Sequence, residues 1–186
     1  MKRITALVAL LALCIMLCAC SCVADTLDSA DTKVGACTEL TIRKLMEQNL
    51  DCYFLYYVEP LPVTTQRNSD GYLGTDGSIY KTFSEFENLI KTTYVKESAD
   101  KLLNYPNKET PLYKGVQDSI FVKPDVTEFE KYNIIWDDSY TITIDSSTDT
   151  QCDFTLNTTD LDSKPYTTKG SAKVQNGKWL LADIIY

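Results

Sequence analysis

The residues that could do chemistry in this chain are its cysteines, carboxylates and tyrosines, because histidine is absent. Without an imidazole, a Ser-His-Asp or Cys-His mechanism has no general base, and zinc sites built on histidine are excluded. Cys37, Cys52 and Cys152 are isolated from one another, so they lack the close pairing of an all-thiolate zinc site. No paired-acid signature is present either. We therefore expect a protein that is not an enzyme and that has neither a cofactor nor a metal site.

Cys20 is the most informative cysteine, and it ends an uncharged, Ala- and Leu-rich run that follows Lys2 and Arg3. A positive start, an apolar stretch and small residues are the parts of a secretory signal. The sequence Leu17-Cys18-Ala19-Cys20 resembles the lipobox of bacterial lipoprotein precursors. The resemblance implies removal of residues 1–19 and lipid attachment at Cys20. Several acyl chains would then hold the protein at the extracytoplasmic face of the bacterial cell membrane.

Two alternatives compete with lipid attachment. The run from Ile4 to Val23 approaches the ~20 residues that span a bilayer, so it could remain as an uncleaved anchor. Cleavage after Ala24 would instead release a soluble protein, because Cys22-Val23-Ala24 loosely fits a cleavage site. All three possibilities predict export from the cytoplasm.

The rest of the chain divides into a short tether and one domain. Residues 20–35 are mostly polar and read as a flexible tether, and residues 36–186 are enough for a single domain with a sizeable core. The net charge of −8 makes nucleic acid a poor partner, because phosphates require clustered Lys and Arg. The acidic charge would suit a basic protein partner, although solubility alone also explains it.

Helical patterns dominate the first part of this domain. Apolar residues between Ala36 and Leu50 fall on one broad face, and Thr82 with Glu85 forms a capping box for a short helix. A second short helix follows and ends before Pro106. The dense aromatic run from Tyr53 to Val58 predicts a buried strand.

Strand patterns dominate the second part. They cover residues 119–122, 132–136 and 139–144, and Cys152, Phe154 and Leu156 alternate with polar residues. Asn176-Gly177 predicts a type I′ hairpin turn between residues 170–174 and 178–181. Helices followed by a run of strands indicate an α+β fold, with N-terminal helices packed on a mainly antiparallel sheet.

The segment from Thr64 to Tyr80 is dense in turn signals and poor in core residues. It does not fit an EF-hand, because Gly77 would stand where the loop needs its bidentate glutamate. We expect an exposed hairpin or a long loop. Its candidate partner-binding residues are two acids and two tyrosines, namely Asp70, Tyr72, Asp76 and Tyr80. The alternative is a surface hairpin without a partner.

Three segments carry a family resemblance, namely residues 80–86 (YKTFSEF), 93–99 (TYVKESA) and 111–114 (PLYK). In this order they resemble the DL-endopeptidase inhibitor (IseA-type) family of exported bacterial proteins. The resemblance implies a cystatin-like domain, in which helices pack on a curved antiparallel sheet. It also implies that the partner is a cell-wall peptidoglycan hydrolase, whose activity the protein restrains.

A different function is a ligand-binding module, because a sheet curved around helices often leaves an apolar cavity. Tyr56, Tyr57, Tyr94 and Trp136 are candidate lining residues, although each also fits a core position.

Two smaller features stay open. Cys37 and Cys52 flank a helix, which places them too far apart for a disulfide, so any intramolecular bond should include Cys152. The alternative is that all three are small buried hydrophobic residues. Asp145, Asp149 and Asp153 could bind a cation, but an exposed turn between strands explains them more simply.

Overall fold

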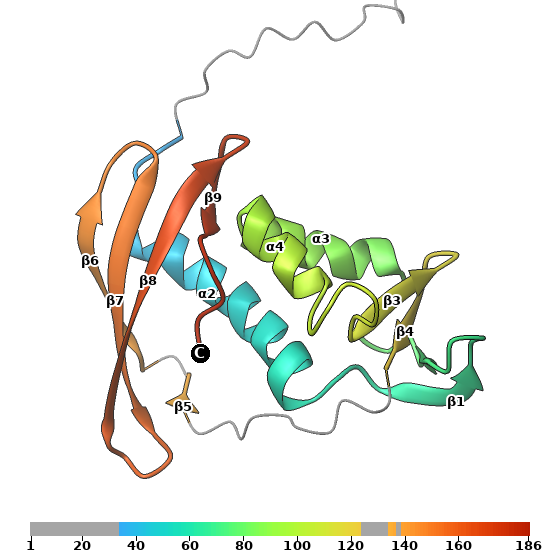
Figure 1. Cartoon of the computed structure of the whole chain (residues 1–186). Helices are drawn as coiled ribbons and strands as arrows, with labels where there is room; N and C mark the ends of the chain where they lie inside the picture. Colours follow the sequence, from blue (N-terminus) through green and yellow to red (C-terminus); the bar gives the residue numbers. More distant parts are fainter. Residues whose placement is uncertain (1–33, 124–133, 137–138) are drawn as a thin grey trace, which may run out of the picture. The chain divides into compact units, whose positions relative to one another are not determined.

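The computed structural model of the protein describes residues 34–123, 134–136 and 139–186. The predictions for the N-terminal leader and for lipid attachment at Cys20, together with most of the tether, lie outside the described residues. Within the described residues the chain forms three α-helices, one π-helix and nine strands in two antiparallel sheets (Figure 1).

The first described helix, α2 (Glu39–Tyr53), begins at a capping box between Thr38 and Thr41. Its buried face repeats at helical spacing along its whole length: Ile42, Leu45, Met46, Asn49, Cys52 and Tyr53. The chain then continues as a π-helix, η1 (Phe54–Val58), in which Leu55 and Tyr56 are buried.

The predicted strand from Tyr53 to Val58 is therefore wrong. Tyr56 lies three positions after Tyr53 and four after Cys52, so it extends the buried stripe of α2 by one more turn. This continuation of the helical stripe outweighs the strand preference of the aromatic residues, which is strongly dependent on context. The turn ends at Glu59, directly before Pro60.

A four-stranded sheet follows, with the strand order β1-β2-β4-β3. Its strands are β1 (Val63–Arg67), β2 (Leu73–Thr75), β3 (Tyr113–Val116) and β4 (Ser119–Val122). The hairpin of β1 and β2 is one of the two arrangements expected for residues 64–80, and β4 confirms the strand predicted at residues 119–122.

Two short helices lie between β2 and β3 in the sequence: α3 (Phe83–Thr93) and α4 (Lys96–Leu103). The capping box predicted for Thr82 and Glu85 is confirmed. Asp118, in the turn between β3 and β4, adds a second cap. Its carboxylate accepts hydrogen bonds from the backbone amide and hydroxyl of Ser84, at 2.9 and 2.7 Å. The start of α3 is thus tied to the four-stranded sheet.

The second sheet contains β5 (Ile134–Ile135), β6 (Thr141–Ser147), β7 (Gln151–Asp160), β8 (Pro165–Gln175) and β9 (Lys178–Leu181). The long strand β7 pairs with β8, and it also pairs with β5 and β6 along successive stretches. The strand predicted at 139–144 is confirmed over residues 141–144, with Ser139 and Tyr140 before β6, and the strand predicted at 152–156 is confirmed in full. Of the strand predicted at 132–136, residues 134–135 form β5 and residues 132–133 lie outside the described residues.

The turn between β8 and β9 confirms the Asn176-Gly177 prediction, because φ is +52° at Asn176 and +71° at Gly177. Glycine is also required at position 170. A Cβ there would lie 2.5 Å from a ring carbon of Phe154 and 2.6 Å from Ile185, so the bare backbone lets the Phe154 ring cross β8.

The fold is α+β with antiparallel sheets, as predicted, but the strands form two sheets rather than one. Helix α2 contacts β6 and β9 of the five-stranded sheet, whereas α3 contacts both β9 and β3. Ring contacts between Tyr56, Phe86 and Tyr113 continue the core toward the four-stranded sheet. Among the helices of the described residues, none has the length and apolar character needed to cross a membrane.

Candidate functional site

Asp70 and Tyr72, the first two predicted partner-binding residues, belong to the β1–β2 hairpin. Asp70 is exposed and forms an ion pair with Lys114 of β3, and the hydrogen bond in this pair lowers the pKa of Asp70. Tyr72 is only 5% exposed, and its hydroxyl donates a hydrogen bond of 2.7 Å to the carbonyl of Pro111. Its ring is therefore buried, and the expectation that it presents an aromatic anchor to a partner is not supported.

Asp76 and Tyr80 lie on the other side of β2, in the loop that leads to α3. Asp76 accepts hydrogen bonds from the amide and hydroxyl of Ser78, at 2.8 and 2.6 Å, and these bonds lower its pKa. The backbone amide of Asp76 donates to the carbonyl of Pro62, at 3.0 Å. Tyr80 is half-buried against the ring of Phe86. Thus the four predicted residues do not form one cluster.

Tyr80 instead lies in an open groove between the end of α2, η1 and the 76–80 loop. We call this the η1 groove, and it has a volume of about 410 Å³. It is lined by apolar side chains and two acids: Asp51, Phe54, Leu55, Glu59, Pro60, Pro62, Ile79 and Tyr80. Phe54 is 38% exposed and Ile79 is 56% exposed, so the groove presents two large apolar side chains to solvent.

The π-helical turn and Tyr113 build the groove. The amide of Glu59 donates to the carbonyl of Phe54, at 2.8 Å, which closes the wide turn. The hydroxyl of Tyr113 donates to the carbonyl of Leu55, at 2.7 Å, and accepts from the amide of Leu61, at 3.1 Å. One buried side chain of β3 thus connects η1 to the segment that follows it. π-Helical turns of this kind are often found at functional sites.

The electrostatics of the η1 groove are acidic. Asp51 and Glu59 line it, and Glu47 lies one turn before Asp51 on α2. Partial burial of the carboxyl group raises the pKa of Asp51, although the residue as a whole is exposed, and the charge of Glu47 raises it further. No described residue forms an ion pair with Asp51 or Glu59. The groove therefore has a negative charge that its described surroundings do not neutralise.

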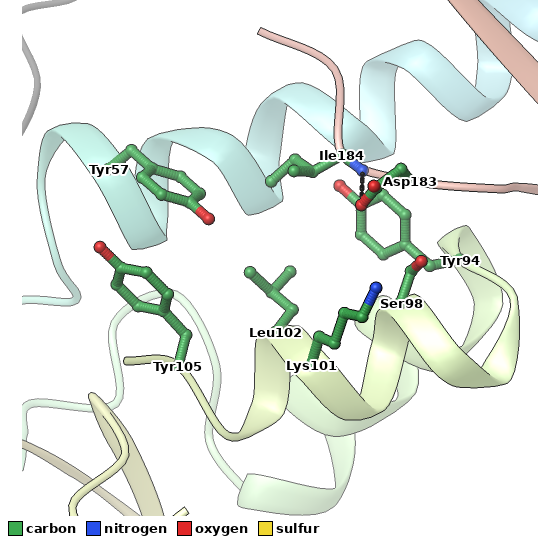
Figure 2. Close-up of a pocket in the computed structure, with 8 residues that line it drawn as sticks. All are labelled: Tyr57, Tyr94, Ser98, Lys101, Leu102, Tyr105, Asp183 and Ile184. Carbon is green, nitrogen blue, oxygen red and sulfur yellow. Dashed lines mark hydrogen bonds between the residues drawn. The ribbon is translucent and has the colours of Figure 1, made fainter. Parts of the chain in front are cut away.

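A second, smaller cavity lies between η1, α4 and the C-terminal segment (Figure 2). Its lining combines three tyrosines with charged and apolar side chains: Tyr57, Tyr94, Ser98, Lys101, Leu102, Tyr105, Asp183 and Ile184. The hydroxyl of Ser98 donates to the carbonyl of Ala182, at 2.6 Å, which attaches α4 to the C-terminal segment.

Asn49 secures the same segment from the other side. Its side-chain oxygen accepts hydrogen bonds from the Tyr94 hydroxyl and from the Ile185 amide, both at 2.9 Å. Its side-chain nitrogen donates to the carbonyl of Ile185, at 2.7 Å. All of these polar groups form hydrogen bonds within the protein. This wall of the cavity therefore holds the C-terminal segment in place.

The small cavity gives little support to a ligand-binding module. Tyr57 and Tyr94 line it as expected, but Tyr56 and Trp136 are core residues with 1% and 8% exposure. Its volume of about 140 Å³ is well below the roughly 300–1,000 Å³ of pockets that hold drug-sized ligands.

The three aspartates on and near β6 and β7 do not gather around a cation. Asp145 accepts a hydrogen bond from the Thr155 hydroxyl, at 2.7 Å, and Asp153 accepts one from the Ser146 hydroxyl, at 2.9 Å. Across residues 34–123, 134–136 and 139–186, no group of three potential ligands could hold a metal ion. The turn interpretation is confirmed only for Asp149, which lies between the two strands, because Asp145 belongs to β6 and Asp153 to β7.

Comparisons with models of protein families and with curated proteins give no match to this chain. The description of the η1 groove therefore rests on the geometry of this protein alone. Its residues Asp51, Phe54, Glu59 and Ile79 were not among the sequence predictions. The available signal was the acidic pair Glu47 and Asp51, spaced by four, directly before an aromatic run that ends at Pro60.

Proposed function

We propose that the protein is a lipid-anchored, extracytoplasmic binding protein whose η1 groove receives a basic surface of a cell-wall DL-endopeptidase and restrains that enzyme. The observation that carries this proposal is the combination of exposed Phe54 and Ile79 with the acids Asp51 and Glu59, with which no described residue forms an ion pair. Aromatic and aliphatic anchors inside a charged rim are typical of protein-binding sites.

The neighbouring strand supports a protein partner rather than a small molecule. All five residues of β1 are exposed, and β1 is an edge strand of its sheet. An exposed edge can pair with a strand of another protein. Because Pro62 lines the groove and Val63 begins β1, one partner could contact the groove and the edge together.

We also propose that the domain is cystatin-like and that the protein is related to the IseA-type family. Helices against antiparallel strands agree with the cystatin-like domain that the IseA-type resemblance implies, and an acidic groove agrees with a basic enzyme partner. Export follows from the Cys20 motif, which would hold the groove at the membrane surface, beside the cell wall.

Inhibition of peptidoglycan cleavage tests this function. The full chain, purified in detergent, should slow the digestion of purified peptidoglycan by a bacterial DL-endopeptidase. The double variant Phe54→Asp/Ile79→Asp should weaken inhibition at least ~10-fold, because a hot-spot anchor typically contributes ~2 kcal/mol or more. Charge reversal with Asp51→Lys/Glu59→Lys should weaken it mainly through slower association at low salt.

Matched variants show whether the groove itself is responsible. Leu161→Asp changes another exposed apolar residue, 65% exposed in the β7–β8 turn, and should leave inhibition unchanged. Charge reversal at Asp70 and Asp76 tests whether the hairpin tip and the 76–80 loop join the same interface. Absence of both binding and inhibition with every DL-endopeptidase tested would contradict the proposal.

Location is tested separately. Metabolic labelling with a palmitate analogue should mark the wild-type chain and not Cys20→Ala. Equal labelling of both proteins would contradict lipid attachment at Cys20 without bearing on the groove.

A further inference from the structure

Three buried cysteines lie in the described part of the protein, and all three are present as thiols. Cys52, on α2, is surrounded by hydroxyl groups. Burial raises its pKa to about 12, while hydrogen bonds with Tyr94 and Thr93 act in the opposite direction. The groups that act on its pKa besides burial are Tyr94, Asp51 and Thr93.

Cys37 and Cys152 belong to the same buried core cluster, and the strand pairing shows which residues share a face of the five-stranded sheet with Cys152. Cys152 of β7 pairs with Ala172 of β8, which pairs with Leu181 of β9, so their side chains share one face. Trp179 lies two residues before Leu181 and therefore on the same face. Its indole nitrogen donates a hydrogen bond of 2.8 Å to the carbonyl of Gly35.

This hydrogen bond places Gly35 beside Trp179, on the face of the sheet that contains Cys152. Cys37 follows Gly35 by two residues, a span of at most ~7 Å. Cys37 is 7% exposed and Cys152 is fully buried in the same core cluster. After burial, a hydrogen bond with the Cys152 thiol is the next cause that raises the pKa of Cys37 to about 12. Strand register, burial and the hydrogen bond between Trp179 and Gly35 thus place Cys37 near Cys152, and the pKa shift agrees with this placement.

We propose that Cys37 and Cys152 form a disulfide bond in the mature exported protein. The two thiols lose two protons and two electrons, and one S–S bond forms. The electrons pass to a disulfide-bearing oxidant, which is reduced to two thiols by exchange through a mixed disulfide. Such bonds persist outside the cytoplasm. The proposal goes beyond the η1 groove and does not depend on any partner.

The bond would join the segment before α2 to the central strand of the five-stranded sheet. It would close a loop of more than 100 residues, which restricts the unfolded chain strongly. Because both thiols are buried, the folded reduced protein should oxidise slowly. Since thiolate is the reactive species, the rate should rise about tenfold per pH unit in the neutral range.

Peptide mapping tests the bond directly, because trypsin separates the cysteines. Cys37 falls in residues 34–43, Cys52 in residues 45–67 and Cys152 in residues 132–169, while Cys22 lies before Lys33. The full chain is isolated from bacterial membranes after blocking free thiols with N-ethylmaleimide. Mass spectrometry should find the 34–43 and 132–169 peptides linked, and Cys52 free. A bond that includes Cys52 or Cys22, or N-ethylmaleimide on both Cys37 and Cys152, would overturn the proposal.

A second arm does not depend on export. The full chain in detergent is reduced and then equilibrated with oxidised and reduced glutathione. The 37–152 bond should form and raise the melting temperature by about 5–15 °C. Cys37→Ala and Cys152→Ala should each abolish this increase, whereas Cys52→Ala should retain it. An equal increase in Cys37→Ala would contradict the assignment even if the variant is less stable overall.

Discussion

The two sheets of this protein differ in the length of their strands and in the regularity of their pairing. Strands β7 and β8 contain 10 and 11 residues and pair without interruption over nine positions. Strands β1 to β4 contain only three to five residues each, and the β1–β2 pairing has an irregular register. We call the five-stranded sheet the frame. The four-stranded sheet instead presents an exposed edge strand, β1, and borders the η1 groove.

This difference indicates where recognition can reside. Short strands with exposed backbone open at lower free energy than a long buried ladder, and binding segments are generally drawn from such regions. The groove nevertheless has one rigid support, because the Tyr113 hydroxyl fixes the turn between Leu55 and Leu61. The protein thus combines an adaptable edge with a fixed groove beside it.

The largest expected effect is in the frame. Phe154 is completely buried over Gly170, so Phe154→Ala should lower the free energy of unfolding by about 3–5 kcal/mol. Val63→Ala in β1, where the side chain is 45% exposed, should change it by less than about 0.5 kcal/mol. Urea denaturation measures both, and similar values for the two variants would remove the distinction between the sheets.

A smaller effect is expected from two hairpin glycines with matched geometry. Gly177 has φ of +71° and Gly71 has φ of +84°, and no neighbouring atom obstructs a side chain at either position. Gly177→Val should destabilise the domain by about 1–2 kcal/mol, because valine is strained at positive φ. Gly71→Val should instead increase hydrogen exchange mainly within β1 and β2. Equal losses of global stability would mean that both hairpins belong to one cooperative unit.

The smallest effect concerns the ion pair at the tip of the β1–β2 hairpin. The hydrogen bond with Lys114 lowers the pKa of Asp70, so the pair stabilises the hairpin above the unfolded-state pKa of aspartate, near 4. This contribution is lost as the pH falls through the lower folded-state value. An NMR titration should therefore give Asp70 a midpoint below that of an ordinary aspartate, and Lys114→Met should raise it. The change Lys164→Met, in the β7–β8 turn, should leave the Asp70 midpoint unaltered.

The five-stranded sheet was the more predictable part from the sequence. Cys152, Phe154 and Leu156 alternate with polar residues because one face of β7 is buried, and Asn176-Gly177 marks its turn by a local backbone preference. Both signals depend on neighbours in the sequence. The capping box at Thr82 was predictable for the same reason.

The four-stranded sheet and the groove depend on contacts between distant residues. The aromatic run after Cys52 fits either a strand or a helix, and it becomes a helical turn because its buried face continues that of α2. Tyr72 reads as an exposed loop residue, and it is buried because Pro111 provides a carbonyl for its hydroxyl. Exposure of Phe54 and Ile79 results from the arrangement of three separate segments, which no local pattern encodes.

The placement of the aromatic side chains has a consequence for spectroscopy. Both tryptophans, Trp136 and Trp179, belong to the part of the protein built around the five-stranded sheet. Tyr56, Tyr105 and Tyr113 cluster around η1 and the four-stranded sheet instead. Indole fluorescence excited near 295 nm will therefore report on the region around the five-stranded sheet, whereas tyrosines lie in both regions, with Tyr140 and Tyr166 beside Trp136. The two tryptophans thus give unfolding of this region its own optical signal without any added dye.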